Sequence, residues 1–221
     1  MTATTTQRNT IGAGLYSLAD LRGFVAFESK EAAEARHVVV WLGRVLNPAG
    51  HQAKQPDYTF SDLISLFVVR QLLREGVRPR NIRAAEMYLR ERWQLERPFI
   101  RSANIQTDGK HVWVDGEVIP GQIESADQRG QQALLEPIRT SLKRVHFDHG
   151  SAAYWAPMNG IVVDPRVQFG EPVVQGTRIP TSAVAGVVRN LGKEEAALRF
   201  GLRAKLLESA LAFEAQISVL N

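Results

Sequence analysis

The chain contains no cysteine among its 221 residues. This absence excludes disulfide bonds, zinc–thiolate sites and a thiol nucleophile, and it fits the reducing environment of the cytoplasm. No apolar run reaches the length of a membrane span, and the N-terminus lacks the charged-then-apolar pattern of a signal peptide. We therefore expect a cytoplasmic protein without membrane contact, with a mobile arm over residues 1–13.

The sequence motifs of common enzyme classes are also absent. There is no Gly-x-Ser-x-Gly nucleophile elbow, no phosphate-binding loop and no dinucleotide-binding glycine pattern. His146, Asp148 and His149 are the one concentrated set of metal-capable side chains, but no later histidine or cysteine could complete a coordination sphere. A solvated loop is the alternative interpretation. Asp164-Pro165 indicates an Asx turn rather than catalysis. We expect no enzyme, no metal and no cofactor.

Lysine is rare, with 6 lysines against 21 arginines. Nine of those arginines lie between residues 70 and 101 together with four glutamates, a local charge of nine minus four, or +5, in a chain of net charge +4. Such a segment predicts contact with a polyanion, because neutralised phosphates supply most non-specific affinity for DNA. A general compositional preference for arginine is the alternative explanation.

Two helices separated by a tight break are predicted near the N-terminus. Tyr16–Phe27 has apolar residues at helical spacing, with Ser17 as an N-cap candidate and Asp20 three positions later. Lys30–Leu46 is expected to form the second helix and, in a helix-turn-helix arrangement, to enter the major groove of DNA. The side chains predicted to contact DNA from this helix are Lys30, Arg36, His37 and Arg44. A surface position without a DNA contact is the alternative for His37.

The next segments predict a helical core followed by a β-hairpin. An apolar helix begins at Thr59-Phe60 and extends to about Glu75, and Pro79 begins a further helix over Arg80–Gln94. Asp108-Gly109 between the strand-like runs Phe99–Gln106 and Lys110–Val114 is a strong hairpin signal. A basic hairpin that follows helices suggests a wing, so we expect Lys110 and the Arg78/Arg80 region to contact phosphates.

The order of these parts resembles the MerR-like winged-helix group over residues 14–116. The resemblance is carried by the Tyr16-Ser17-Leu18 opening, the Thr59–Leu63 helix start, the Gly76-Val77 turn and the Asp-Gly wing. It implies a DNA-binding domain. Residues 117–130, rich in glycine, proline and acids, are expected to be a linker. An amphipathic helix over Gly130–Val145 would then open a second domain over residues 131–221.

The last quarter of the chain contains its most specific motif. Ile161–Val163 and Pro172–Val174 predict a strand pair, and Gly176–Pro180 (Gly-Thr-Arg-Ile-Pro) precedes a change to helical periodicity. Thr181 or Ser182 is expected to cap the first of three helices, which are predicted over Thr181–Leu191, Lys193–Phe200 and Arg203–Gln216. The predicted fold is therefore mainly α with small β wings, in two winged helix-turn-helix-like domains joined by a linker.

This segment resembles the family called domain of unknown function 433, through Asp164-Pro165, Gly170-Glu171-Pro172 and Gly176–Pro180. The resemblance implies a VapB-type antitoxin of a type II toxin–antitoxin system, encoded beside a PIN-like ribonuclease toxin. Such a protein neutralises the toxin and represses its own operon as a homodimer on operator DNA. A stand-alone MerR-like regulator and an adaptor that binds only proteins are the alternatives.

PIN-like nucleases hold magnesium with carboxylates, so an arginine that pairs with those carboxylates would block the metal. The toxin-binding arginines predicted on this basis are Arg178, Arg199 and Arg203, and Phe213 is added from the apolar face of the last helix. Two alternatives stay open. The Arg178 guanidinium could instead hold the turn by bonding carbonyls or Asp164. The apolar face of Arg203–Gln216 could be a dimer contact or part of the core.

Overall fold

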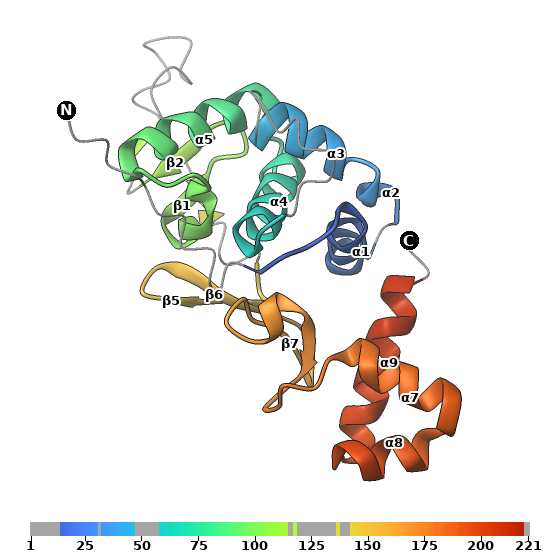
Figure 1. Cartoon of the computed structure of the whole chain (residues 1–221). Coiled ribbons are helices and arrows are strands. Elements are labelled where there is room, and N and C mark those ends of the chain that lie inside the picture. Colours follow the sequence, from blue (N-terminus) through green and yellow to red (C-terminus); the bar gives the residue numbers. More distant parts are fainter. Residues whose placement is uncertain are drawn as a thin grey trace, which may run out of the picture.

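The computed structural model describes a helical N-terminal half, central strands and a C-terminal group of helices (Figure 1). The described residues are 14–30, 32–46, 58–114, 117–118, 136–137 and 142–218. Within them the chain is rich in helix and has two small antiparallel sheets, which confirms the predicted mainly helical fold with small β elements. The arm expected over residues 1–13 lies outside this part. None of the described helices has the length and apolar character needed to cross a membrane.

Helices α1 (Leu18–Ser29) and α4 (Phe60–Arg74) both begin with a capping box. The Ser17 hydroxyl accepts a hydrogen bond from the backbone N–H of Asp20 at 3.1 Å, and the Asp20 carboxylate accepts one from the N–H of Ser17 at 2.8 Å. Thr59 and Asp62 make the equivalent bonds at the start of α4. Each box satisfies backbone N–H groups that a helix start leaves unpaired, so both predicted starts are confirmed.

Helix α4 is buried along most of its length, and helix α5 (Pro79–Trp93) packs in the same core. The predicted proline begins α5, where its missing N–H costs no hydrogen bond. Ile82, Ala85 and Leu89 are buried at helical spacing on one side of α5. The prediction that these two helices build the N-terminal core is confirmed.

The single helix predicted over Lys30–Leu46 is wrong. The segment folds as α2 (Ala32–Ala35), a turn, α3 (Val38–Val40) and a π-helical segment η1 (Trp41–Leu46). Three successive valines form α3, and their β-branched side chains are restricted in a helix. A largely buried ion pair between Glu34 and Arg70 also fixes α2 against α4. Tertiary contacts and local sequence therefore interrupt the expected periodicity.

The first sheet has the strand order β3-β2-β1-β4 and is antiparallel throughout. Its strands are β1 (Ile105–Thr107), β2 (Val112–Val114), β3 (Glu117–Val118) and β4 (Glu136–Pro137). The predicted Asp-Gly hairpin is confirmed as β1–β2, although Phe99 lies in the preceding 3-10 segment η2 (Pro98–Asn104) rather than in a strand. The helix predicted over Gly130–Val145 is wrong where the chain is described, because β4 and Val145 are extended.

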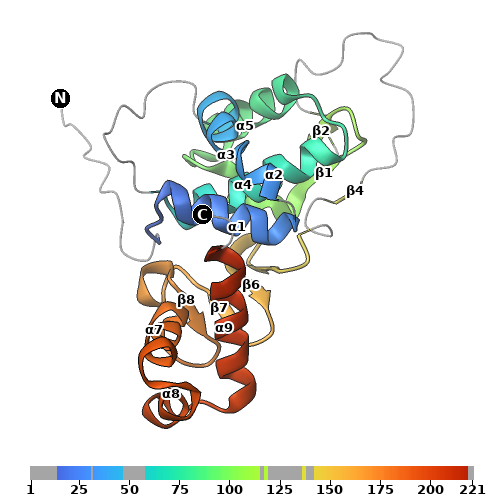
Figure 2. The same cartoon turned by 90° about the vertical axis from the view of Figure 1, so that its right-hand side faces the viewer.

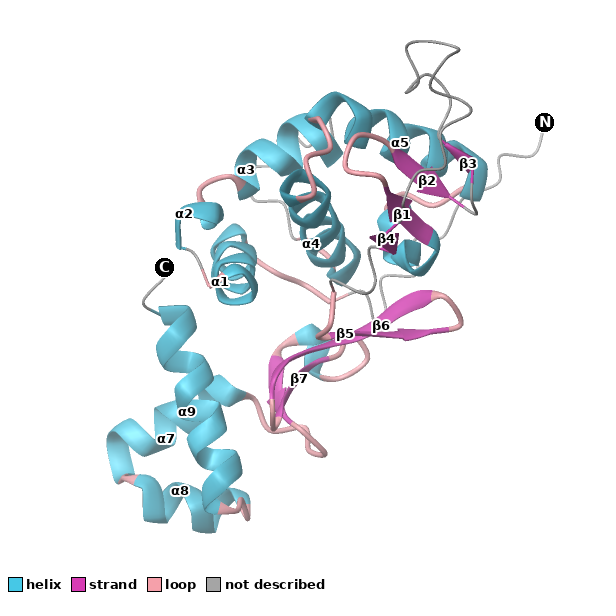
Figure 3. Cartoon of the chain, turned by 180° about the vertical axis from the view of Figure 1, so that it is seen from behind, coloured by secondary structure: helices cyan, strands magenta, loops and turns pink. Residues whose placement is uncertain are grey.

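The second sheet has the order β5-β6-β7-β8, again antiparallel. Its strands are β5 (Val145–Asp148), β6 (Ser151–Met158), β7 (Ile161–Val163) and β8 (Pro172–Val174). The predicted strand pair is confirmed, with Ile161 opposite Val174 and Val163 opposite Pro172. Figure 3 shows β1–β3 beside α5 and the β5–β6 hairpin on the other side of α4.

Three C-terminal helices follow with the predicted bounds almost unchanged. They are α7 (Thr181–Leu191), α8 (Lys193–Phe200) and α9 (Ala204–Ser218), and Gly192 and Gly201 stand between them. The predicted cap is wrong, because Pro180 occupies the N-cap position of α7 and makes no side-chain bond there. The buried Thr181 hydroxyl bonds instead to Glu214 of α9 and to the carbonyl of Pro172, which ties the helices to β8.

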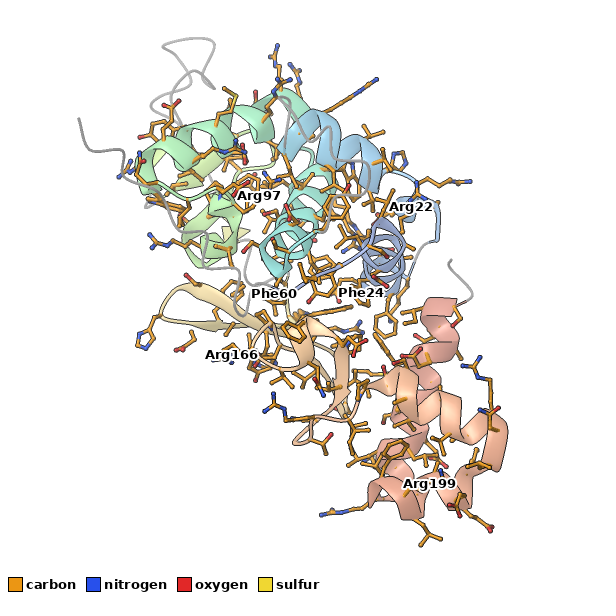
Figure 4. The ribbon with its side chains drawn as sticks, in the orientation of Figure 1. Arg22, Phe24, Phe60, Arg97, Arg166 and Arg199 are labelled. Atoms are coloured by element: carbon orange, nitrogen blue, oxygen red, sulfur yellow. The ribbon has the colours of Figure 1, made fainter. Side chains whose placement is uncertain are left out.

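An aromatic cluster joins the N-terminal helices to the C-terminal half. Phe24 and Phe27 of α1 have ring centroids 5.4 and 6.0 Å from that of Trp155 in β6. Phe213 of α9 packs on Phe27 at 5.1 Å, and Phe67 of α4 on Trp155 at 5.2 Å. Figure 4 shows Phe24 at this boundary. Buried residues from both sides belong to one hydrophobic cluster, so residues 14–114 and 142–218 share a core.

Candidate nucleic-acid interface

Seven of the nine arginines between residues 70 and 101 divide into two groups, while Arg92 and Arg101 lie over the rings of Tyr88 and Trp93. Arg70, Arg90 and Arg97 form ion pairs with Glu34, Glu86 and Asp62, respectively. Arg90 and Arg97 also donate to the carbonyl of Leu46 at 3.0 and 2.8 Å, which fixes the end of η1. These three arginines are structural. The arginines at positions 74, 78, 80 and 83 lie around the α4–α5 turn and are exposed.

The tip of the β1–β2 hairpin is fixed by an Asx turn. One carboxylate oxygen of Asp108 accepts from the backbone N–H groups of Lys110 at 2.9 Å and His111 at 2.7 Å, and the other lies 2.8 Å from the His111 ring nitrogen Nδ1. Partial burial opposes ionisation, but the hydrogen bonds from His111 and Lys110 hold the pKa of Asp108 below its usual value. These bonds therefore fix the backbone at Lys110, whose side chain is exposed.

The hairpin tip packs against the α4–α5 turn. The Asn81 amide donates to the carbonyl of Lys110 at 2.9 Å. A Cβ on Gly109 would lie 3.0 Å from the carbonyl oxygen of Glu75, and φ there is +82°, so both the space and the backbone require glycine. The contact between the hairpin tip and the α4–α5 turn places Lys110 beside the N-terminus of α5, where Arg78 and Arg80 are exposed.

We call Arg74, Arg78, Arg80, Arg83 and Lys110 the hairpin–α5 surface. The first N–H groups of a helix and its dipole favour an anion at its N-terminus. The exposed cations of this surface add to that field. Sequence reasoning selected Arg78, Arg80 and Lys110 and did not select Arg74 or Arg83. Their positions were the available signal. Arg83 lies three residues after Arg80 on α5, and Arg74 lies at the end of α4, before the same turn.

The other predicted DNA-contacting residues do not share one helix face. Lys30 ends α1 with φ of 60°, and Arg36 and His37 occupy the turn between α2 and α3. The His37 ring stacks on Trp41, with centroids 5.9 Å apart. Arg44 lies in the π-helical segment η1. All four are exposed, but the expected presentation by a single recognition helix is wrong because that helix is interrupted.

The predicted toxin-binding arginines lie in the C-terminal half and are all exposed. Arg178 has no side-chain partner in the described part of the chain. Arg199 of α8 pairs with Glu195 at 2.6 Å on the surface (Figure 4). Arg203 precedes α9, and its carbonyl accepts the N–H groups of Leu206 and Leu207. Helices α7 and α8 lie at the opposite end of the molecule from α5 in both Figures 1 and 2.

Asp164 is held by Arg166 and not by Arg178. The Arg166 guanidinium donates to the two carboxylate oxygens of Asp164 at 2.9 and 2.7 Å, and its backbone N–H donates at 2.9 Å, which confirms the predicted Asx turn. Burial opposes the charge, yet these bonds hold the pKa of Asp164 below its usual value. The interpretation of Arg178 as a partner of Asp164 is therefore wrong.

Phe213 does not lie on the surface, and its prediction as a toxin contact is wrong. It is 0% exposed and packs against Phe24 and Phe27. Leu207 and Ala210 of the same helix are buried too, so the apolar face of α9 belongs to the protein's own core. The apolar periodicity of α9 correctly predicted that one face of the helix is buried. It could not show that the residues packed on that face are Phe24 and Phe27 of α1.

Of the metal-capable residues at β5 and its turn, Asp148 and His149 lie 3.6 Å apart, and His146 packs elsewhere. The His146 ring stacks on Tyr154, with centroids 4.3 Å apart, while Asp148 and His149 are exposed at the β5–β6 turn. The described residues include no group of three or more histidine, cysteine, aspartate or glutamate side chains suited to a metal ion.

Comparison with known proteins identifies one segment of the chain. Residues 161–213 match the family described as "Protein of unknown function (DUF433)". That range covers β7, β8, α7, α8 and most of α9, and it agrees with the predicted resemblance. The fold is similar to the crystal structure of Rv2018 from Mycobacterium tuberculosis, with a TM-score of 0.54 over 89% of this chain and 96% of that one. The sequence identity is 16%, so this similarity concerns the fold. No curated protein matches the sequence.

Proposed function

We propose that this chain is a VapB-type antitoxin of a type II toxin–antitoxin system. It binds operator DNA with the N-terminal half and neutralises a PIN-like ribonuclease with the C-terminal half. The observation that carries the DNA-binding part is the contact between the hairpin tip and the α4–α5 turn, which gathers exposed cations beside a helix N-terminus. It acts by binding alone and needs no cofactor.

The hairpin–α5 surface contacts phosphates and sets the position of the protein on DNA. Lys110 acts as the wing contact, as in the MerR-like arrangement. Lys30, Arg36 and Arg44 are exposed outside this surface and supply further contacts from the segments around α2 and η1. A palindromic operator requires two copies of the surface, so the DNA-bound form is a homodimer.

The nuclease contact uses Arg178, with Arg203 and Arg199 as further exposed cations on the C-terminal half. Arg178 is exposed and has no side-chain partner among the described residues, so its guanidinium is available for bidentate pairing with a carboxylate. The ion pair of Arg199 with Glu195 is exposed, and such pairs contribute little free energy, so a partner can exchange it. Occupation of the metal-binding carboxylates then inactivates the nuclease.

The DNA-binding part is tested by fluorescence anisotropy with the DNA upstream of the chain's own operon. Five phosphate contacts predict that affinity falls by about 500-fold between 0.05 and 0.2 M salt, because each contact contributes about 0.9 to the logarithmic slope. Affinity that does not change with salt would exclude this use of the hairpin–α5 surface. The second part is tested by adding the purified chain to the product of the adjoining gene and measuring RNA cleavage. Undiminished cleavage would exclude an antitoxin.

A stand-alone MerR-like regulator is the second candidate. The burial of Phe213 favours it, because it removes one apolar side chain from the surface expected to contact a toxin. This candidate predicts salt-dependent operator binding together with no complex between the chain and the product of the adjoining gene.

A further inference from the structure

Phe169 is 70% exposed, although it belongs to the family-matched segment and lies between two strands. It occupies the short 3-10 turn η4 (Gln168–Gly170), which connects β7 to β8. Phenylalanine at the surface leaves a large apolar ring in water. Neither the DNA surface nor the arginines proposed for nuclease contact account for this ring.

The backbone that carries Phe169 is strained. Gln168, Phe169 and Gly170 have φ angles of 46, 53 and 85°, so three successive residues lie in the left-handed region. A bulky side chain rarely adopts this conformation, and strain of this kind persists where the surrounding structure enforces it. An asparagine or glycine at position 169 would adopt this left-handed backbone conformation with less strain.

Several hydrogen bonds enforce the turn. The Leu15 N–H donates to the Phe169 carbonyl at 3.0 Å, and the Tyr16 hydroxyl donates to the Gly170 carbonyl at 3.0 Å. On the other side, the Gln168 amide donates to the carbonyl of Arg178 at 3.0 Å. The turn is therefore fixed between the N-terminal segment and the Gly-Thr-Arg-Ile-Pro loop, and it holds the Phe169 ring in solvent.

Hydrogen bonds link the Phe169 turn to one exposed apolar residue and one exposed cation. Leu15, whose N–H bonds to Phe169, is 52% exposed. Arg178, whose carbonyl bonds to Gln168, is exposed and has no side-chain partner among the described residues. We call Leu15, Phe169 and Arg178 the Phe169 patch.

The charges around the patch decide which class of partner it fits. The exposed Glu171 lies two residues from Phe169, and Arg166 is neutralised by Asp164. Unlike the hairpin–α5 surface, the patch therefore combines one exposed cation with an exposed carboxylate close to it in sequence. A polyanion would be repelled by Glu171 and gain little from Arg166. A protein surface with an apolar pocket beside a carboxylate fits both the ring and Arg178.

We propose that the Phe169 patch is the docking point for the partner nuclease, with the Phe169 ring in an apolar pocket and Arg178 paired with a carboxylate at its edge. This inference rests on the proposed antitoxin function. The strained turn fixes the backbone that carries the ring before binding, so little backbone freedom is lost when the complex forms. Aromatic and arginine side chains in such positions supply most of the binding free energy of many interfaces.

The test uses the full chain, the purified product of the adjoining gene and isothermal calorimetry. Phe169→Asn removes the ring and retains a residue that tolerates the left-handed backbone. We expect its nuclease affinity to fall by about 30-fold or more, the effect of losing a central interface residue, while its thermal unfolding temperature is unchanged or higher. Arg178→Gln should weaken binding by about 10-fold and reduce its salt dependence.

Met87→Gln is the matched control, because Met87 is a 48% exposed apolar side chain on α5, outside the Phe169 patch. It should bind the nuclease as the unchanged protein does. Equal affinity of Phe169→Asn and the unchanged protein would overturn the docking site alone. Failure of the unchanged protein to bind would overturn the antitoxin function and the docking site with it. Loss of self-association in Phe169→Asn, with nuclease affinity unchanged, would assign the patch to a second copy of the chain and overturn the proposal.

Discussion

The Tyr16 hydroxyl donates a hydrogen bond to the carbonyl of Gly170 at 3.0 Å, across 154 positions of sequence. Tyr16 is 3% exposed, and burial together with the nearby carboxylates of Asp20 and Asp164 raises the pKa of its hydroxyl. The hydroxyl therefore remains a donor across the physiological pH range. This bond ties the start of the N-terminal half to the glycine of the Gly-x-Pro motif, so that motif helps to fix the relation of the two halves.

Gly170→Ala is expected to destabilise the chain by about 2–4 kcal/mol. A Cβ at this position would lie 2.4 Å from the Tyr16 hydroxyl oxygen, and φ is +85°, a conformation that alanine rarely adopts. Tyr16→Phe removes only the hydrogen bond and should cost about 1–3 kcal/mol, because the carbonyl of Gly170 loses its donor. Urea unfolding followed by circular dichroism measures both effects.

Gly186→Ala is the control for this pair. Gly186 lies inside α7, where an added Cβ meets no atom within 4 Å. Alanine has the higher helix propensity, so this variant should be as stable as the unchanged protein or up to about 1 kcal/mol more stable. If Gly170→Ala also proved neutral, the contact between Tyr16 and the turn would not be fixed in the folded protein.

Substitutions at Arg97 and Arg83 should distinguish an arginine that stabilises the fold from one that binds DNA. Arg97→Met leaves Asp62 without its buried partner and removes a donor to the Leu46 carbonyl, so we expect a loss of about 3–5 kcal/mol in unfolding free energy. Arg83→Ala changes an exposed residue of the hairpin–α5 surface and should alter stability by less than about 0.5 kcal/mol while weakening operator binding. Unfolding curves and anisotropy on the same two proteins distinguish these effects, and a reversal of the pattern would contradict the assignment.

The sequence predicted those elements whose signals are local. Ser17 with Asp20 and Thr59 with Asp62 mark helix starts through bonds between residues three apart, and the structure contains both capping boxes. The hairpin at Asp108-Gly109 was also predicted correctly, because its turn signal lies in two neighbouring residues. The helices after Gly176–Pro180 were placed almost to the residue because Gly192 and Gly201 end them.

The errors occurred where distant contacts decide the structure. Nothing in the spacing of Lys30–Leu46 shows that Glu34 pairs with Arg70, 36 positions away. The pairing of Glu86 with Arg90 could have been anticipated from its separation of four residues, but that of Asp62 with Arg97 could not. Charge counting therefore treated buried and exposed arginines alike. Only the exposed arginines, together with the hairpin contact that places Lys110 beside them, bear on the candidate DNA-binding site.

Lys110→Ala is expected to weaken operator binding uniformly across related sequences. The side chain stands on a hairpin tip that is fixed to α5 through Asn81, which suits a phosphate contact rather than a base contact. The logarithmic slope of affinity against salt should decrease by about 0.9. Lys205→Ala, an exposed change on α9 at the other end, should leave both values unaltered. An unchanged slope in Lys110→Ala would place the DNA contacts away from the hairpin.

The N-terminal half is not expected to fold without the C-terminal half. A fragment of residues 1–141 would expose Phe24, Phe27 and Phe67, which pack on Trp155 or Phe213 in the complete chain. We expect it to lose cooperative thermal unfolding and to bind a dye specific for exposed apolar surface. The milder change Phe213→Ala should cost about 3–5 kcal/mol. A cooperative transition in the fragment would show that each half has its own sufficient core.

Acid should weaken the turn at Asp164. Because bonds from Arg166 hold the folded pKa of Asp164 below the ordinary value of 3.8, the ionised carboxylate contributes stability that is fully present above pH 3.8. That contribution is lost as the pH falls through the folded value. Asp164→Asn should therefore be about 1–3 kcal/mol less stable than the unchanged protein at pH 6, and this difference should shrink at pH 3. Glu208→Gln, an exposed change on α9, should show no difference at pH 6. A stability gap for Asp164→Asn that stays constant between pH 6 and pH 3 would mean that the ion pair with Arg166 contributes nothing through its charge.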